Sequence, residues 1–168
     1  MINNPPGMEF RESEFIRYRL SNDYIRGLTD GEGCFTFCTN TYRKEGRAIK
    51  QKIPTFVIAM NVRDRWLLIE TAEHLGIKDN VYIHKAWKKD GYNRGDTVRF
   101  MVRSFDQLKD IIIPFFYKKL AGYKGEQFVS WLESIGSDPA VAPRYKPLYN
   151  LYKSGYWDNP KNIPEKLV

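Results

Sequence analysis

The chain has 168 residues, 42% of them hydrophobic, which is enough for one compact domain with an apolar core, and it has no internal repeat. Its 27 Lys and Arg exceed its 20 Asp and Glu, and the formal net charge of +7 favours a polyanionic partner. No apolar run reaches the length of a membrane helix and the amino end lacks the features of a secretory signal, so we expect a soluble, intracellular protein with no membrane partner.

Residues 23–33 predict a short helix that leads directly into a strand. Polar residues just before it can cap its amino end, and glycines near residue 33 suit a helix end followed by extended chain. Gly27 and Gly31 lie four residues apart on one helix face, where the missing side chains let another backbone come close. The sequence therefore predicts that this helix packs against a second helix.

Two acids, Asp30 and Glu32, stand at the carboxyl end of this helix. The helix dipole disfavours carboxylates there, so the pair needs a positive partner such as a metal ion. The leucine-like, Gly, Leu, Asp, Gly, acid and Gly positions of a nine-residue pattern are occupied by Ile25, Gly27, Leu28, Asp30, Gly31, Glu32 and Gly33. This pattern resembles the LAGLIDADG motif of the homing endonuclease family, with Arg26 where a small residue is common.

The resemblance implies an α+β fold in the order αββαββα, whose four-stranded antiparallel sheet forms a DNA-binding saddle. Family members with a single motif act as homodimers, and this chain carries the motif once. The implied activity is that of a site-specific homing endonuclease, encoded in an intron or intein. Such an enzyme makes a staggered double-strand break in a long, roughly palindromic double-stranded DNA target by Mg²⁺-dependent phosphodiester hydrolysis. No organic cofactor is implied, and the expected compartment is the cytoplasm of a prokaryote or an organelle that encodes the protein.

The first predicted strand starts near residue 33, with Phe35 and Phe37 on its apolar face. A basic loop at residues 43–47 precedes a second strand over about residues 50–61. Family geometry favours an inward position for Phe56 and Ile58 in this strand.

An amphipathic helix is predicted over residues 63–75, with Trp66 among its apolar positions and Gly76 as its end. A second hairpin follows, with strands over residues 81–87 and 97–103 joined by a turn. The apolar face of its last strand is expected to hold Val98, Phe100 and Val102.

Two further helices, over residues 105–113 and 118–135, are predicted to cover the other side of the sheet, with Pro114 as the interruption between them. The tail is rich in Pro and aromatic residues and is expected to pack on the core or to contact DNA. The expected division is a lead-in with a short helix (1–20), an endonuclease core domain (21–136) and the tail (137–168).

The resemblance also implies catalytic roles. Glu32 is expected to bind the divalent metal, with the Gly31 backbone carbonyl beside it. A basic residue near the start of the last core helix stabilises the transition state, and both Lys124 and Lys119 are candidates. Lys124 is preferred, because its spacing to a following Phe resembles the family pattern. The polar residue that organises water near the end of the second strand is one of Asn61, Arg63 and Arg65.

Strand alternation and local basic charge predict the DNA-contacting residues. They are Thr36, Cys38, Asn40, Tyr42, Arg43, His84, Lys88, Arg99 and Arg103. The motif helix is expected to supply the dimer interface through Ile25, Gly27, Leu28, Asp30 and Gly31. Asp30 is expected to cap or to form hydrogen bonds rather than to bind metal.

Two alternatives remain. An intron maturase or DNA-binding regulator could have the same fold without cleavage, although such proteins often lack the acid that this chain retains at Glu32. A basic α/β protein with an accidental motif would be a monomer.

Overall fold

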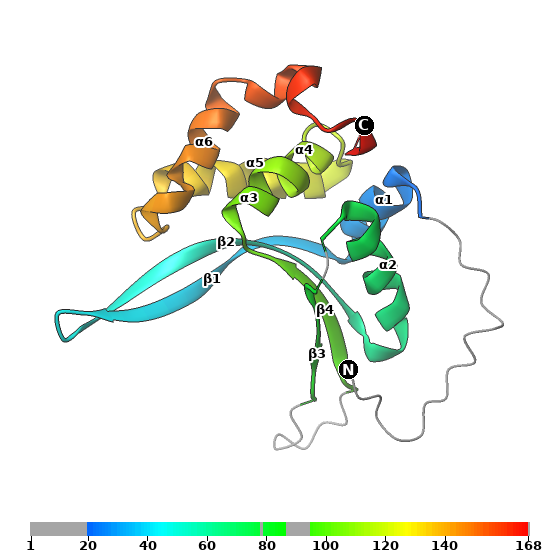
Figure 1. The fold of residues 1–168 in the computed structure, drawn as a ribbon, viewed down its shortest axis with the longest axis horizontal. Helices are drawn as coiled ribbons and strands as arrows, with labels where there is room; N and C mark the ends of the chain where they lie inside the picture. Colours follow the sequence, from blue (N-terminus) through cyan, green and yellow to red (C-terminus); the bar gives the residue numbers. More distant parts are fainter. Residues whose placement is uncertain (1–19, 78, 87–94, 168) are drawn as a thin grey trace.

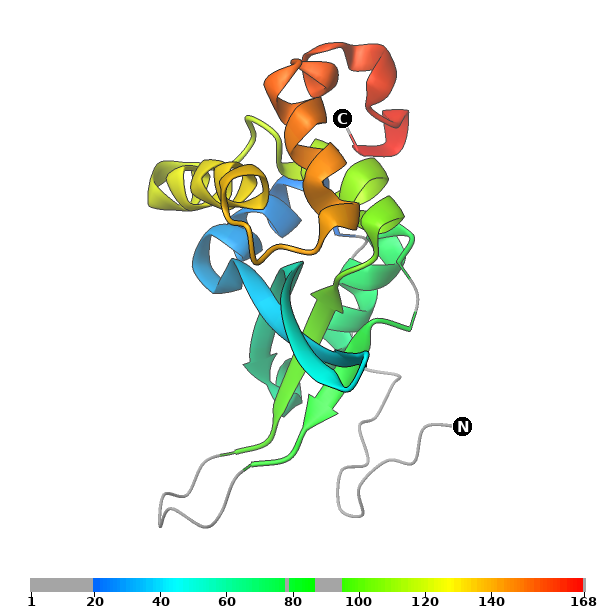
Figure 2. The ribbon, with the colours of Figure 1, turned by 90° about the vertical axis from the view of Figure 1, so that its left-hand side faces the viewer.

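The structure is a computed structural model that describes residues 20–77, 79–86 and 95–167. Its α-helices and strands are, in chain order, α1 (Asn22–Glu32), β1 (Gly33–Lys44), β2 (Arg47–Asn61), α2 (Arg65–Leu75), β3 (Val81–His84), β4 (Thr97–Val102), α3 (Phe105–Gln107), α4 (Ile113–Phe116), α5 (Gly122–Ser137) and α6 (Lys146–Lys153). The strands form one antiparallel sheet in the order β1-β2-β4-β3. In Figures 1 and 2 the helices α3 to α6 gather on one side of this sheet, and the β1–β2 hairpin reaches away from them. The predicted α+β fold and its αββαββα order are confirmed.

One face of the sheet is buried because apolar side chains occupy every second position of its strands. Phe56 pairs with Val102, and Ile58 pairs with Phe100, across β2 and β4, and none of these four side chains is exposed. The ring of Phe35 on β1 lies 5.2 Å from the ring of Phe56, centroid to centroid. The inward positions predicted for these strands are confirmed.

The first hairpin is longer than predicted. Lys44 pairs directly with Arg47, and only Glu45 and Gly46 form the turn, with φ angles of 51° and 78°. Positive φ at both central residues gives a two-residue turn whose twist matches that of the flanking strands. The prediction of a basic loop at residues 43–47 is therefore wrong, because most of these residues belong to the strands and have a defined face.

Pro114 does not end the helix that contains it. A π-helical turn, Leu108–Ile112, joins α3 to α4, and the helical run continues to Phe116. Proline lacks the N–H that a regular helix needs, and here it follows a wider turn in which the regular hydrogen-bond ladder is already interrupted. The next helix begins at Gly122 rather than near residue 118, because the intervening turn includes Lys118 at a φ of 57°.

The end of α2 is as predicted, since Gly76 adopts a left-handed conformation with a φ of 73°. Its buried face differs from the prediction, because Leu68 and Thr71 are buried whereas Trp66 is 40% exposed. The Thr71 hydroxyl donates to the Leu67 carbonyl (2.8 Å), so it can be buried without losing its hydrogen bond. None of the described helices combines the length and apolar character that a membrane-spanning segment requires.

The residues after α5 return over the helices and the edge of the sheet (Figure 1). The side chains of Tyr145, Leu148, Trp157 and Leu167 are at most 2% exposed and belong to the same core as the sheet. The predicted lead-in helix, most of the second hairpin's turn and the end of its first strand at Trp87 lie outside the described residues.

Candidate functional site

The motif helix α1 has a defined beginning and a defined end. The Tyr24 backbone N–H donates to the Ser21 hydroxyl (3.1 Å), and the Gly33 N–H donates to the Thr29 carbonyl. A Cβ atom at Gly33 would lie 2.4 Å from the Thr29 Cγ2 atom and 2.7 Å from the Thr29 oxygen. The last glycine of the motif is therefore required by the tight passage from α1 into β1.

No contact with another described residue of this chain requires glycine at the other two motif positions, Gly27 and Gly31. A Cβ atom added at Gly27 or Gly31 would meet no described atom within 4 Å. With Tyr24, which is 49% exposed, and the half-buried Leu28, they form one open helix face with the spacing i, i+3, i+4 and i+7. Ile25 does not belong to this face, because its side chain is fully buried in the core of this chain.

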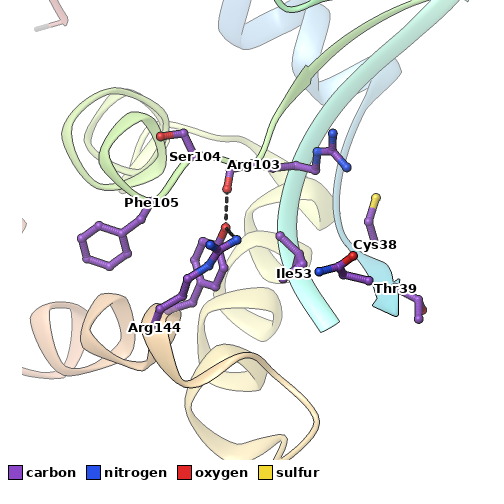
Figure 3. Close-up of a pocket in the computed structure, with 9 residues that line it drawn as sticks. Cys38, Thr39, Ile53, Arg103, Ser104, Phe105 and Arg144 are labelled. Carbon is purple, nitrogen blue, oxygen red and sulfur yellow. Dashed lines mark hydrogen bonds between the residues drawn. The ribbon is translucent and has the colours of Figure 1, made fainter. Parts of the chain in front are cut away.

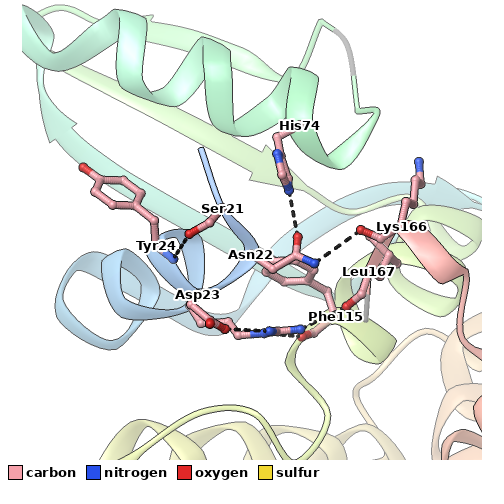
Figure 4. A network of polar contacts seen from close by, with 9 residues as sticks. Ser21, Asn22, Asp23, Tyr24, His74, Phe115, Lys166 and Leu167 are labelled. Carbon is pink, nitrogen blue, oxygen red and sulfur yellow. Dashed lines mark hydrogen bonds and ion pairs between the residues drawn. The ribbon is translucent and has the colours of Figure 1, made fainter. Parts of the chain in front are cut away.

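Arg26 explains how the opposite side of α1 is held. Its side chain is 10% exposed, donates to the carbonyls of Phe115 (3.3 Å) and Leu167 (2.9 Å), and stacks 4.9 Å above the Phe115 ring. Asn22 adds a contact from its amide to the Lys166 carbonyl (3.4 Å; Figure 4). The large residue at this motif position therefore ties α1 to the end of α4 and to the carboxyl-terminal segment.

Glu32 ends α1, and its side chain is exposed. The Lys124 ammonium, from the first turn of α5, donates to the Gly33 carbonyl (2.7 Å). Gly33 is the residue directly after Glu32. The side chain of Lys119 is exposed and forms no hydrogen bond or ion pair with another described residue. The structure therefore places the ammonium of the lysine that the sequence favoured at the backbone junction directly after Glu32.

Asp30 faces the start of α5, where one carboxylate oxygen lies 3.5 Å from the Ala121 backbone nitrogen. Its other oxygen is buried and has no hydrogen-bond partner within the described part of the chain. Asn61 accepts a hydrogen bond from the Arg63 backbone N–H (3.1 Å), which caps the turn after β2. Since Gly33 pairs with Ile58, Asn61 lies three residues, roughly 10 Å, beyond the start of β1 along the sheet.

The outward face of the sheet carries most of the predicted DNA contacts. Arg99 lies between Ala59 on β2 and Tyr82 on β3, and its Nε atom is buried without a hydrogen-bond partner among the described residues. Tyr82 is 45% exposed, and the sequence analysis did not single it out. Strand alternation, which pairs it with Arg99, is the signal that could have found it.

The hairpin residues are divided between the two faces of the sheet. Asn40 and Tyr42 follow the alternation of Thr36, whereas Arg43 lies on the opposite face of β1. The position on the outward face near the hairpin end belongs instead to Lys44, paired with Arg47. His84 is exposed on β3, and Lys88 lies outside the described residues.

Glu32 is the side chain that the sequence predicted as a metal ligand. Within the described residues, no group of three or more His, Cys, Asp and Glu side chains could hold an ion. The exposed Glu32 carboxylate has the donor chemistry that Mg²⁺ prefers, and it stands beside the open face of α1. The chemistry of Glu32 therefore fits a ligand of a divalent ion.

Comparison with known proteins places this geometry in a family. The family model of the LAGLIDADG endonucleases matches residues 25–135. The meganuclease I-CpaMI bound to uncleaved DNA is 19% identical, with a TM-score of 0.58 over 91% of this chain and 47% of that chain. The I-LtrWI LAGLIDADG homing endonuclease bound to target DNA is 30% identical, with a TM-score of 0.53 over 68% of this chain and 36% of that chain.

A third similar structure is the I-SmaMI LAGLIDADG homing endonuclease bound to cleaved DNA, 22% identical with a TM-score of 0.57 over 84% of this chain and 46% of that chain. I-SmaMI also matches in a form bound to an uncleaved DNA target in the presence of calcium ions. The chain spans less than half the length of each of these structures. Because the family model extends from the motif helix through both hairpins to α5, this chain belongs to the LAGLIDADG endonuclease family.

Proposed function

We propose that two copies of this chain form a site-specific DNA endonuclease, with their α1 helices packed together at a two-fold axis. The observation that carries the proposal is the open face of α1. Gly27 and Gly31 leave space that nothing in the described chain fills, and the exposed ring of Tyr24 borders that space. A self-complementary face of small residues suits an isologous contact between identical helices.

Pairing of the α1 helices would bring the two Glu32 carboxylates toward each other at the carboxyl ends of the helices. Two carboxylates in one place repel each other unless a cation lies between them. The Glu32 carboxylate and the Gly31 carbonyl of each copy would hold Mg²⁺ or another divalent ion. When bound, such an ion lowers the pKa of water and stabilises charge on the leaving oxygen.

Lys124 supplies fixed positive charge at the same place. Its bond to the Gly33 carbonyl holds the ammonium at the junction of α1 and β1, directly after the helix ends at Glu32. A positioned cation stabilises the extra negative charge of the phosphoryl transition state. We assign Lys124 this role in preference to Lys119, which lacks such an anchor. Asn61 remains a candidate for orienting water.

Double-stranded DNA would lie along the outward face of the sheet. Arg99 suits a guanine contact in the major groove. The two-fold axis between the copies would repeat each DNA contact of one copy in the other. Such an arrangement reads a roughly palindromic target and breaks the two strands at symmetric, staggered positions. The whole chain carries a formal net charge of +7, which favours binding to a polyanion.

The test is cleavage of a library of duplex DNA sites with and without Mg²⁺, using the natural chain and the Glu32→Gln variant. We expect cleavage only with metal, and a loss of about 100-fold or more in the variant, with DNA binding retained. Cleavage that persists unchanged in Glu32→Gln would refute the assignment of this residue. Specific binding of the natural chain without any cleavage would instead indicate a maturase or regulator.

A further inference from the structure

A groove of about 490 Å³ opens where β4 ends (Figure 3). Its existence follows from the sheet. The pairing of β2 with β4 stops at Phe56, and the next partner along the same edge of β2 is the tail, which bonds to Lys52. The Lys52 N–H donates to the Ala140 carbonyl (2.8 Å), and the Ala142 N–H donates to the Lys52 carbonyl (3.0 Å). Between these two partners no described strand pairs with this edge of β2.

The groove joins the outward face of the sheet to the tail. Cys38 and Asn40 reach it from the outward face of β1, and Arg103 follows β4 in the same alternation as Arg99. The full lining is Cys38, Thr39, Asn40, Ile53, Arg103, Ser104, Phe105, Arg144 and Tyr145. The groove is therefore a continuation of the surface along which we expect DNA.

The charge of the groove is positive and uncompensated. Two arginines line it, and none of the described lining residues is acidic. The Arg103 guanidinium forms no hydrogen bond or ion pair with another described residue. Asp138, which precedes Arg144 in the tail, is already paired with the Lys52 ammonium (2.6 Å).

The second arginine is oriented by its neighbour. Arg144 donates to the Tyr145 hydroxyl (3.1 Å) and lies 4.9 Å from the centre of that ring. The Tyr145 hydroxyl in turn donates to the Arg103 carbonyl (2.6 Å), and the Tyr145 side chain is 1% exposed. The buried tyrosine thus holds the guanidinium of Arg144 and the backbone of Arg103, and the order imposed on Arg144 lowers the entropy that binding would cost at that residue.

We propose that this groove binds backbone phosphates of DNA that continues beyond the sheet, with Arg103 and Arg144 as the donors. Guanidinium groups match phosphate oxygens in geometry and charge, and the groove has room for far more than a single ion. These contacts carry no base information, so they strengthen binding to any duplex long enough to reach the groove. The inference rests on the proposed function for the path of the DNA.

The experiment measures the affinity of the full chain for a long duplex of random sequence over about 50 to 200 mM salt. Arg144→Gln and Arg103→Gln should each weaken binding roughly 3- to 10-fold and reduce the salt slope by about 0.9. Arg144→Lys should restore the slope. The matched control is Lys161→Gln, which removes one exposed positive charge from the same tail, and it should leave affinity and slope unchanged. Thermal unfolding checks that each variant is folded.

The outcomes separate this inference from the proposed function. Salt slopes of Arg144→Gln and Arg103→Gln equal to that of Lys161→Gln would overturn the groove as a phosphate site, even if the natural chain cleaves DNA. A reduced slope in a protein that cleaves no member of the site library would keep the groove and remove the nuclease assignment. No binding of the random duplex at low salt would overturn both.

Discussion

Arg26→Met tests how the motif helix is held. The substitution keeps an unbranched apolar side chain but removes the donors to the Phe115 and Leu167 carbonyls and the stacking on the Phe115 ring. A hydrogen bond from a charged group is worth about 1.5–3 kcal/mol, and the cation–π contact about 1 kcal/mol. Relief of the desolvation of a buried guanidinium offsets part of this sum. We expect a net loss of about 2–4 kcal/mol in the free energy of unfolding.

The assay is urea unfolding followed by circular dichroism, with hydrogen exchange of residues 163–167 as a local readout. For a chain of this size the loss corresponds to a fall in Tm of about 5–12 °C. The matched control is Asp23→Asn, because the Asp23 side chain is 92% exposed and its ion pair with Arg26 should contribute less than about 1 kcal/mol. Equal losses in the two variants, or an Arg26→Met variant as stable as the natural chain, would refute this reasoning.

Four further substitutions test the motif glycines, the role of Lys124 and the pKa of Asp138. Gly33→Ala should lower the free energy of unfolding by about 1–3 kcal/mol through overpacking, whereas Gly27→Ala should leave the single chain folded. Urea unfolding at low protein concentration measures the free energy of unfolding of both variants. Lys124→Met should lower single-turnover cleavage far more than DNA affinity, since its charge is assigned to the transition state. Hydrogen bonds from the Lys52 ammonium and, to a smaller extent, from the Ala140 amide hold the pKa of Asp138 below its ordinary 3.8. This carboxylate therefore adds stability above pH 3.8, and that stability is lost as the pH falls through the lowered pKa. Asp138→Asn should therefore lose less stability on acidification, as an acid titration of the fold would record.

Local patterns were enough to predict much of the fold. Alternation along β4 gave its buried face, because a half-buried strand has a period of two. The spacing of Lys124 to a phenylalanine favoured it over Lys119, and the structure does bring Lys124 to the end of α1. The extent of the hairpin turn was predicted wrongly because one of its two positive φ angles lies at Glu45, a residue type that is uncommon in two-residue turns.

Contacts between distant parts of the chain could not be predicted. The two carbonyls that Arg26 binds lie 89 and 141 residues away, so nothing in the motif indicates that a buried arginine would have partners. The groove likewise depends on Arg103 and Arg144, which only the return of the tail to the edge of β2 brings together. Ile25 was assigned to the interface from the motif alone, and its burial in this chain removes it from the proposed set.

The most direct test of the central claim is the molar mass of the protein in solution by sedimentation equilibrium. One chain has a mass of 19.8 kDa, so the account predicts twice 19.8 kDa for the natural chain, free and on DNA. It also predicts 19.8 kDa for a Gly27→Leu, Gly31→Leu double variant that retains its helical content. A natural chain that stays at 19.8 kDa at every concentration, and binds DNA as one chain per duplex, would contradict the account.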